Sequence, residues 1–266
     1  MTFVDTHAHL EAVDDLNGVL NRAKNIGVGK IVTIGTSIET SKREVKIAEE
    51  FSNKDLKIYA TCGIHPKDGK GKVEKLGLYR CIDTLKQIVI SSKKVVGVGE
   101  AGLDYYPVTT DSEKNFQRDL FETQIKLAVE LNLPLVIHCR NAWNEIFGSI
   151  SKFKVQSSKL TGVFHSWTGD WQTAKRALDL GFYISFSGIV TFKNAKDIQE
   201  VARKIPLEKL LLETDSPYLS PEPLRGEQNE PKNVKIVGKF IAGLRNQPIS
   251  LIASKTSASA AVLFKI

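Results

Sequence analysis

Eight short runs of apolar and β-branched residues recur along this chain of 266 residues, and each run stops at a glycine or a polar residue. Such runs predict buried strands, and several of the segments between them have the periodicity of amphipathic helices. The strands begin roughly 20 to 40 residues apart, which is the length of a strand, a helix and their two loops. Eight such units fill the roughly 250 residues of a (β/α)8 barrel. The expected strands are residues 3–5, 30–35, 57–62, 95–99, 135–137, 162–164, 182–186 and 210–213. The expected helices are residues 14–25, 40–52, 112–131, 170–180 and 194–205, with two more helical patterns within 231–264.

The distribution of turn residues indicates one domain. Glycines and prolines mark turns, and no linker, repeat or low-complexity segment interrupts the sequence pattern. We therefore predict an α/β protein, a TIM barrel that forms a single domain over residues 1–266. An open, doubly wound sheet is the alternative, because the same alternation of strands and helices would build it.

The composition is that of a globular protein. Hydrophobic residues make up 42% and charged residues 25%, which excludes disorder, collagen and coiled coil. Three cysteines, an odd number without close spacing, favour reduced thiols and a cytoplasmic location. No apolar run suggests a membrane span and no leader pattern stands at the start, so no membrane partner is expected. The net charge of +7 is compatible with an anionic substrate but does not identify one.

Only five histidines occur in the chain, and two of them form the motif His7-Ala8-His9 after the first expected strand. Residues two apart in a strand point to the same side, so both imidazoles can converge on one point. Converging imidazoles bind divalent metal ions, although a lone motif of this kind also occurs as two unrelated polar residues in a loop.

Four further polar residues each end an expected strand, on the side of a parallel barrel where active sites lie. They are Glu100, His138, His165 and Asp215. Any one of them could simply hydrogen-bond to neighbouring backbone, but six residues placed alike predict a metal centre. Four imidazoles and two carboxylates exceed the needs of one tetrahedral ion. We therefore predict two divalent ions, one of them bridged by a carboxylate.

Seven motifs, in order and over nearly the whole chain, resemble those of the TatD family of metal-dependent deoxyribonucleases. They are HAHL at 7–10, GIHP at 63–66, GEAGLDYY at 99–106, VIHCRNA at 136–142, FHSWTGD at 164–170, GFYISFSGIVTFKNA at 181–195 and LLETDSPYL at 211–219. Members of that family are TIM barrels of the amidohydrolase-like superfamily. The resemblance therefore implies metal-dependent cleavage of phosphodiester bonds in DNA, single-stranded or at 3′ ends, often as a 3′ to 5′ exonuclease.

The resemblance also implies roles for these residues. It places His7, His9, Glu100 and Asp215 around one ion, with Glu100 bridging to the second. Asp215 is in addition the expected general base, which takes the proton from the attacking water. Glu100 and Asp215 are thus expected to act in catalysis as well as in metal binding.

The second ion is expected between Glu100, His138 and His165. The fifth histidine, His65, is expected from the resemblance to face the scissile phosphate, both binding substrate and acting in catalysis; the alternative is a turn residue before Pro66. Such ligands suit zinc, manganese or iron, and the carboxylates and a phosphate substrate also permit magnesium. The resemblance favours magnesium or manganese, with zinc possible.

Substrate contacts are expected from residues that follow the strands. Arg140, Asn141, Lys193 and Arg225 could donate hydrogen bonds to phosphate oxygens, or they could be exposed loop residues. Several aromatic rings beside the motifs could stack on bases, or they could pack the loops onto the barrel rim. These rings belong to Tyr105, Tyr106, Trp167, Trp171 and Tyr218.

The loop at residues 220–231 departs from the family pattern. Leu224, Glu227 and Gln228 stand where family members commonly have histidine, lysine and arginine, and fewer cations should weaken the binding of a polyanion. A metal-dependent deacylase or amidohydrolase, acting on an ester or amide such as aminoacyl-tRNA, is therefore the alternative function. A nucleic-acid-binding protein without catalysis is a third hypothesis, disfavoured because binding requires no converging set of ligands.

Overall fold

Eight parallel strands follow one another around the molecule in chain order, which is the arrangement of a TIM barrel. The computed structural model describes residues 2–107 and 109–266. Between the first and last strands the barrel closes through a bridge from Ala8 to Ser216. Because the order never reverses, the predicted barrel is confirmed and the doubly wound alternative is wrong. The strands are β1 Phe3–Ala8, β2 Val28–Ile34, β3 Lys57–Cys62, β4 Val95–Asp104, β5 Leu135–Arg140, β6 Gly162–Phe164, β7 Tyr183–Phe186 and β8 Leu210–Leu212.

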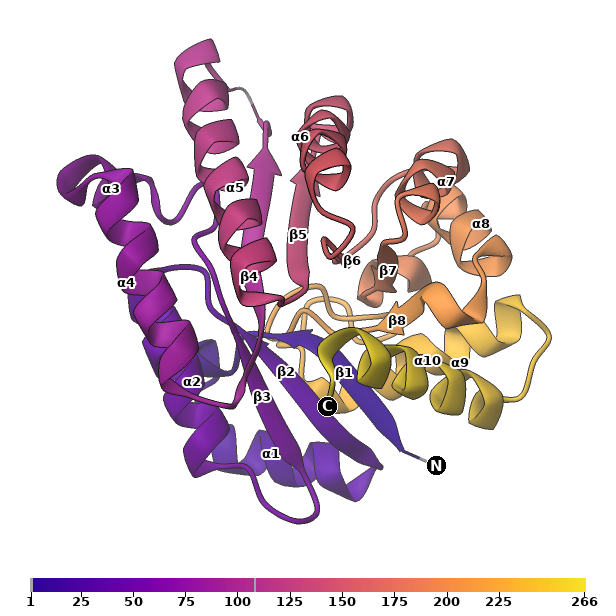
Figure 1. The fold of residues 1–266 in the computed structure, drawn as a ribbon. Helices are drawn as coiled ribbons and strands as arrows, with labels where there is room; N and C mark the ends of the chain where they lie inside the picture. Colours follow the sequence, from indigo (N-terminus) through magenta and orange to yellow (C-terminus); the bar gives the residue numbers. More distant parts are fainter. Residues whose placement is uncertain (1, 108) are drawn as a thin grey trace.

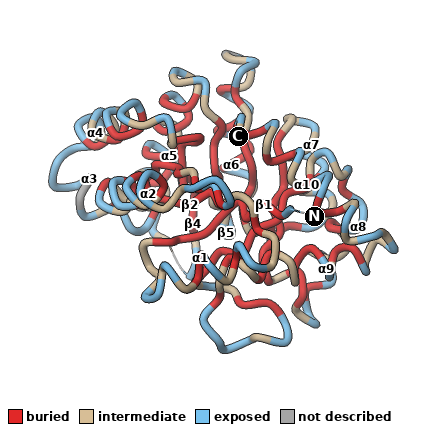
Figure 2. Tube along the Cα trace, turned by 90° about the horizontal axis from the view of Figure 1, so that it is seen from below, coloured by how far each residue is buried: buried red, intermediate tan, exposed pale blue. Residues whose placement is uncertain are grey.

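Helices form the outer layer of the barrel (Figure 1). In the tube view their outward sides are exposed while the strands are almost entirely buried (Figure 2). Three of them, α3, α4 and α6, lie outside the helical segments expected from the sequence. The helices are α1 Leu16–Asn25, α2 Ile38–Glu50, α3 Lys70–Leu76, α4 Leu78–Ser91, α5 Asp111–Leu131, α6 Trp143–Gln156, α7 Trp171–Asp179, α8 Lys196–Lys204, α9 Val234–Leu244 and α10 Ile249–Phe264.

Three strands extend further at their carboxyl ends than the sequence predicts, which changes the position of their polar residues. Glu100 lies within β4 and not at its end, and the same holds for His7 in β1 and His138 in β5. In β4 the extension depends on glycine. Gly99 has a φ of +143°, and a Cβ there would lie only 2.5 Å from the carbonyl oxygen of Val136. Glycine therefore allows β4 to stay paired with β5 beyond the predicted stop.

Strand alternation places an apolar layer directly beneath the polar residues. Buried side chains from several strands pack with Leu263 and Phe264 of α10, and the side chain two residues further along each strand points to the same face. The pairs of apolar and following polar residue are Val136 and His138, Val163 and His165, and Leu211 and Glu213. This layer excludes water from below and leaves the polar side chains facing the carboxyl ends of the strands.

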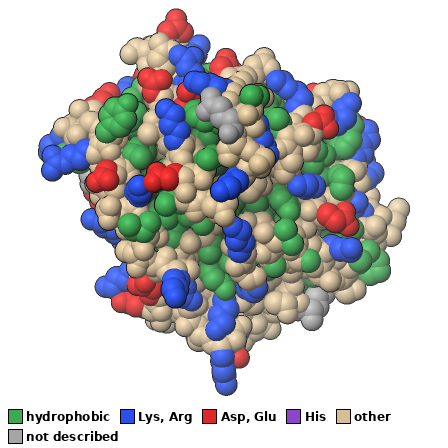
Figure 3. Space-filling view, viewed as in Figure 1, with side chains coloured by type: hydrophobic (Ala, Val, Ile, Leu, Met, Phe, Trp, Pro, Cys, Tyr) green, Lys and Arg blue, Asp and Glu red, His purple; other side chains and the backbone are tan. Residues whose placement is uncertain are grey.

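On the face of the molecule in Figure 3, side chains of one charge do not gather into a single patch. Lys and Arg side chains are scattered among Asp and Glu over the face in Figure 3. Within the described residues, no helix has both the length and the apolar character to cross a membrane.

Candidate active site

Four side chains from three parts of the barrel meet at its centre. The Nε2 atoms of His7 and His9 lie 3.3 Å apart. Asp215 Oδ1 is 3.5 Å from His7 Nε2 and 3.4 Å from His9 Nε2. Glu100 Oε2 is 3.4 Å and 3.9 Å from the same two nitrogens. Ligands around a tetrahedral ion with bonds of about 2.1 Å lie roughly 3.4 Å from one another. These donor atoms are therefore spaced to share one cation.

The other oxygen of Glu100 faces a second group of donors. Glu100 Oε1 lies 2.8 Å from His138 Nδ1 and 2.9 Å from His165 Nε2. The two imidazole nitrogens are 3.3 Å apart. Ligands at right angles around an ion with bonds of about 2.1 Å lie roughly 3.0 Å apart, so this group also fits a cation. Glu100 thus contributes one oxygen to each group.

The electrostatics of these groups favour positive charge between them. Burial opposes ionisation of Glu100, but the charge of His165 and the hydrogen bonds from His138, His165 and His7 hold its pKa well below the usual value. Burial likewise opposes ionisation of Asp215, whose pKa is lowered by its hydrogen bond with His9 and by neighbouring imidazoles. Both carboxylates are therefore ionised at neutral pH, as metal ligands must be.

Three imidazoles are oriented by contacts on the side away from the donor groups. His9 Nδ1 lies 3.2 Å from the carbonyl oxygen of Ile34 in β2. His138 Nε2 lies 3.3 Å from Asp104 Oδ2, and His165 Nδ1 lies 3.5 Å from Glu213 Oε1. Such contacts set the tautomer and direction of metal-binding histidines.

Asp104 is a carboxylate that the sequence reasoning did not select. Burial raises its pKa, but hydrogen bonds from His138 and from the Tyr106 N–H, with the charges of His138 and Lys67, lower it to about 2. Lys67 Nζ lies 3.3 Å from Asp104 Oδ1. The available signal was its place in strand β4, four residues after Glu100 and within the GEAGLDYY motif.

His65 lies at the edge of the second donor group. Its Nε2 is 3.8 Å from Glu100 Oε1, and its ring centroid is 4.6 Å from that of His138. Its Nδ1 is 3.5 Å from Asp68 Oδ2. The imidazole therefore lines the site without joining either compact set of donors, a position compatible with the expected contact to substrate.

Two adjoining cavities open above the donor groups. One has a volume of about 360 Å³ and the other about 280 Å³. Both are lined by His138, His165, Asp215 and the half-exposed Tyr218. The larger cavity also has apolar walls from Ile189 and Leu219 near the imidazoles, so the site offers polar and apolar surface side by side.

The four hydrogen-bond donors expected to bind substrate differ in their position relative to the two cavities. Arg140 lines the larger cavity, and its guanidinium lies 3.9 Å from the centroid of the Tyr106 ring. Asn141 is exposed and Arg225 lies over the Phe192 ring, and neither lines either cavity. Lys193 is likewise exposed outside the lining.

The aromatic residues also differ from one another in whether they reach the cavities. Tyr218 lines both cavities and its ring lies 5.8 Å from that of His9. Trp167 is only 1% exposed and packs against Trp143 and Phe164, so of the two alternatives for this ring, packing of the loop holds and stacking on bases does not. A large apolar ring in this loop gains more from burial than from exposure at the rim.

The comparisons with known proteins agree with this geometry. A family model described as "TatD related DNase" matches residues 4–265. The uncharacterized metal-dependent hydrolase YabD of Bacillus subtilis is 39% identical over 265 residues, which cover 98% of each chain. The uncharacterized metal-dependent hydrolase YcfH of Escherichia coli is 35% identical over 272 residues, with 100% of this chain and 97% of YcfH covered.

A solved structure shows the same fold. The crystal structure of YjjV, a TatD homologue from Escherichia coli, superposes with a TM-score of 0.87 at 31% identity, and the match covers 99% of this chain and 98% of that one. Family match, relatives and fold agree with a buried centre whose donor atoms are spaced for cations. The chain therefore belongs to the TatD family of metal-dependent hydrolases.

Proposed function

We propose that this protein is a two-metal phosphodiesterase that hydrolyses DNA, removing nucleotides from a 3′ end. The observation that carries the proposal is the position of Glu100, whose Oε2 faces His7 and whose Oε1 faces His138 and His165. A carboxylate that serves two donor groups at once is the arrangement of a bridged pair of ions. Magnesium or manganese is the expected pair, with zinc as the other candidate.

Divalent ions held there would stabilise the attacking and leaving oxygens of an in-line displacement. Asp215 lines both cavities and is ionised, so its carboxylate can take the proton from the attacking water. His65 lines one of the cavities, with its Nε2 3.8 Å from Glu100 Oε1, and can hydrogen-bond to an oxygen of the scissile phosphate. Arg140 at the cavity wall can pair with a neighbouring phosphate, and Tyr218 offers a partly exposed ring to a terminal base.

The first test is degradation of a single-stranded oligonucleotide labelled at its 5′ end, with magnesium or manganese. A ladder that shortens step by step supports 3′ to 5′ action, whereas immediate release of the label shows cleavage from the 5′ end. Chelator should abolish turnover. Glu100→Gln should lower it at least about 100-fold, because loss of an outer contact alone costs about 10–100-fold at metal sites.

Glu122→Gln is the control. Glu122 is a half-buried carboxylate of α5 that accepts a hydrogen bond from Lys152 Nζ at 2.6 Å, and it contributes to neither donor group and lines neither cavity. This variant should retain turnover. Undiminished degradation by Glu100→Gln protein, with its metal content measured as zero, would refute the assigned centre.

A metal-dependent deacylase is the second candidate, and one observation favours it. Among the described residues that line the two cavities, Arg140 is the single lysine or arginine. A polyanion usually meets more cations than that, whereas an ester or amide needs few. Turnover of aminoacyl-tRNA or a small ester, with oligonucleotide left intact under the same conditions, would favour this candidate over the nuclease.

A further inference from the structure

Three residues beside the two donor groups each bury a polar side-chain atom that has no hydrogen bond. These atoms, three of the five of this kind among the described residues, are His7 Nδ1, His165 Nδ1 and Glu213 Oε2. The three residues bring a nitrogen or carboxylate oxygen each within 4.8 Å of the others. Buried polar groups in folded proteins are nearly always paired, so such a cluster calls for a role.

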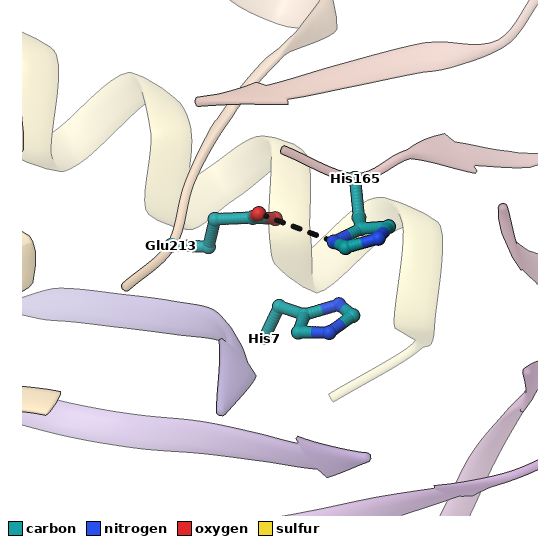
Figure 4. A group of neighbouring side chains, drawn as sticks. All are labelled: His7, His165 and Glu213. Atoms are coloured by element: carbon teal, nitrogen blue, oxygen red, sulfur yellow. Dashed lines mark ion pairs between the residues drawn. The ribbon is translucent and has the colours of Figure 1, made fainter. Parts of the chain in front are cut away.

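The two imidazoles of this cluster come from different donor groups. His7 belongs to the group with Asp215, and His165 to the group with His138. Their rings nevertheless stack on each other, with centroids 4.0 Å apart and planes within 11° (Figure 4). One residue placed beside the stack can therefore reach both rings.

Glu213 is that residue. It follows β8, its side chain is 1% exposed, and its carboxylate lies beside the stack, with Oε1 3.5 Å from His165 Nδ1 (Figure 4). The backbone N–H of Ser166 donates to the same Oε1 at 2.7 Å and holds the carboxylate in place. Oε2 keeps its capacity to accept.

We propose that Glu213 is a positioning residue shared by both metal sites, which accepts the Nδ1–H groups of His7 and His165. A neutral imidazole has one N–H, so a ring that binds an ion through Nε2 must carry its proton on Nδ1. Both rings then carry a buried Nδ1–H, and Glu213 has a carboxylate oxygen within 4.8 Å of a nitrogen of each ring. The inference rests on the proposed two-ion centre and adds that one carboxylate behind it tunes both ions together.

The test is equilibrium dialysis of manganese against the wild type, Glu213→Gln and Glu122→Gln. Glutamine preserves the size of the side chain and an acceptor for the Ser166 N–H, but it removes the charge. Glu213→Gln should weaken both manganese sites by about 10–100-fold. Glu122→Gln changes a carboxylate on α5 that pairs with Lys152, outside the cluster and both donor groups, and it should leave both affinities unchanged.

Two binding results would overturn the inference. Glu213→Gln protein could bind both ions like the wild type, or it could lose affinity at one site only, which would show that the carboxylate is not shared. Failure of the wild type to bind any divalent ion would instead remove the proposed centre itself, so the two failures are distinguishable.

A second measurement on the wild type needs no variant. In zinc-loaded protein labelled with 15N-histidine, NMR should show protons on Nδ1 of both His7 and His165, shifted downfield and protected from exchange with water. Imidazoles that carry no protected Nδ1–H would refute the role of Glu213, even if Glu213→Gln failed to fold.

Discussion

Trp167 offers a direct test of how the loop after β6 is held. Its ring centroid lies 4.6 Å from that of Trp143 and 5.7 Å from that of Phe164, the latter at 89°. Its indole Nε1–H donates to the carbonyl of Gly169 at 2.7 Å. Because His165 lies two residues earlier, this packing also fixes one end of the donor cluster.

The cost of truncating Trp167 follows from its burial. An aromatic ring buries about 150–250 Å², and at about 25 cal/mol per Å² this is worth roughly 4–6 kcal/mol. Truncations of buried Phe or Trp to Ala cost about 3–5 kcal/mol, so about 4 kcal/mol is expected for Trp167→Ala. Trp167→Phe retains most of the apolar contact but leaves the Gly169 carbonyl unpaired, for about 1–2 kcal/mol.

The assay is urea unfolding monitored by circular dichroism. The protein is first freed of metal by chelator, so that bound ions do not stabilise the folded state and shift the midpoint. With a slope of about 3 kcal/mol per M, the midpoint should fall by roughly 1.3 M for Trp167→Ala and about 0.5 M for Trp167→Phe. A midpoint unchanged in Trp167→Ala would refute the packing argument. If Trp167→Phe had the stability of the wild type but bound substrate more weakly, the result would indicate that Trp167 contacts the substrate.

Three further predictions concern a surface carboxylate, a buried thiol and a glycine. Burial barely affects Glu113, and its hydrogen bonds from Lys70 and Thr110 lower its pKa to about 2. A folded pKa below the unfolded value gives stability that is present above about pH 4.5 and is lost as the pH falls toward 2. As the pH falls through this range, the melting temperature of Glu113→Gln should therefore decrease less than that of the wild type. Equal decreases in the two proteins would contradict this. Burial raises the pKa of the Cys62 thiol to about 12. At mildly alkaline pH, mass spectrometry should therefore find Cys62 unmodified by a thiol reagent in the native protein and modified after unfolding. Rapid modification in the native protein would argue against its burial. A Cβ at Gly63 would lie 2.4 Å from the carbonyl carbon of Gly99. Gly63→Ala should therefore lower both the melting temperature and the metal affinity. A variant equal to the wild type would show that β3 and β4 can move apart at little cost in free energy.

The fold could be predicted because its signals are local. A buried parallel strand needs a short apolar run, and the strands at 57–62 and 162–164 were expected with the bounds observed for β3 and β6. The ends of β1, β4 and β5 could not be predicted, because pairing with a neighbour decides where a strand stops. In β4, Gly99 permits a close approach to Val136, and this tertiary contact cannot be predicted from the local sequence.

The candidate metal donors were also recognisable, since histidines and carboxylates that directly follow apolar runs are rare and chemically distinctive. The residues that orient them were not. Asp104 lies 34 residues before His138, and Glu213 lies 47 residues after Ser166, whose N–H holds it. Nothing in the sequence around either carboxylate shows which imidazole it will contact, because that contact exists only once the barrel has closed.

The sequence by itself determined the order of strands and helices and the donor types of the centre, because periodicity and side-chain chemistry are properties of the chain. The tertiary structure decided which atoms meet. It divided the two oxygens of Glu100 between two groups of imidazoles, buried Trp167 in the core and left Arg225 over Phe192 outside the cavities. Barrel closure brings residues from distant strands within a few ångströms, and only that distance turns a list of candidate ligands into a site.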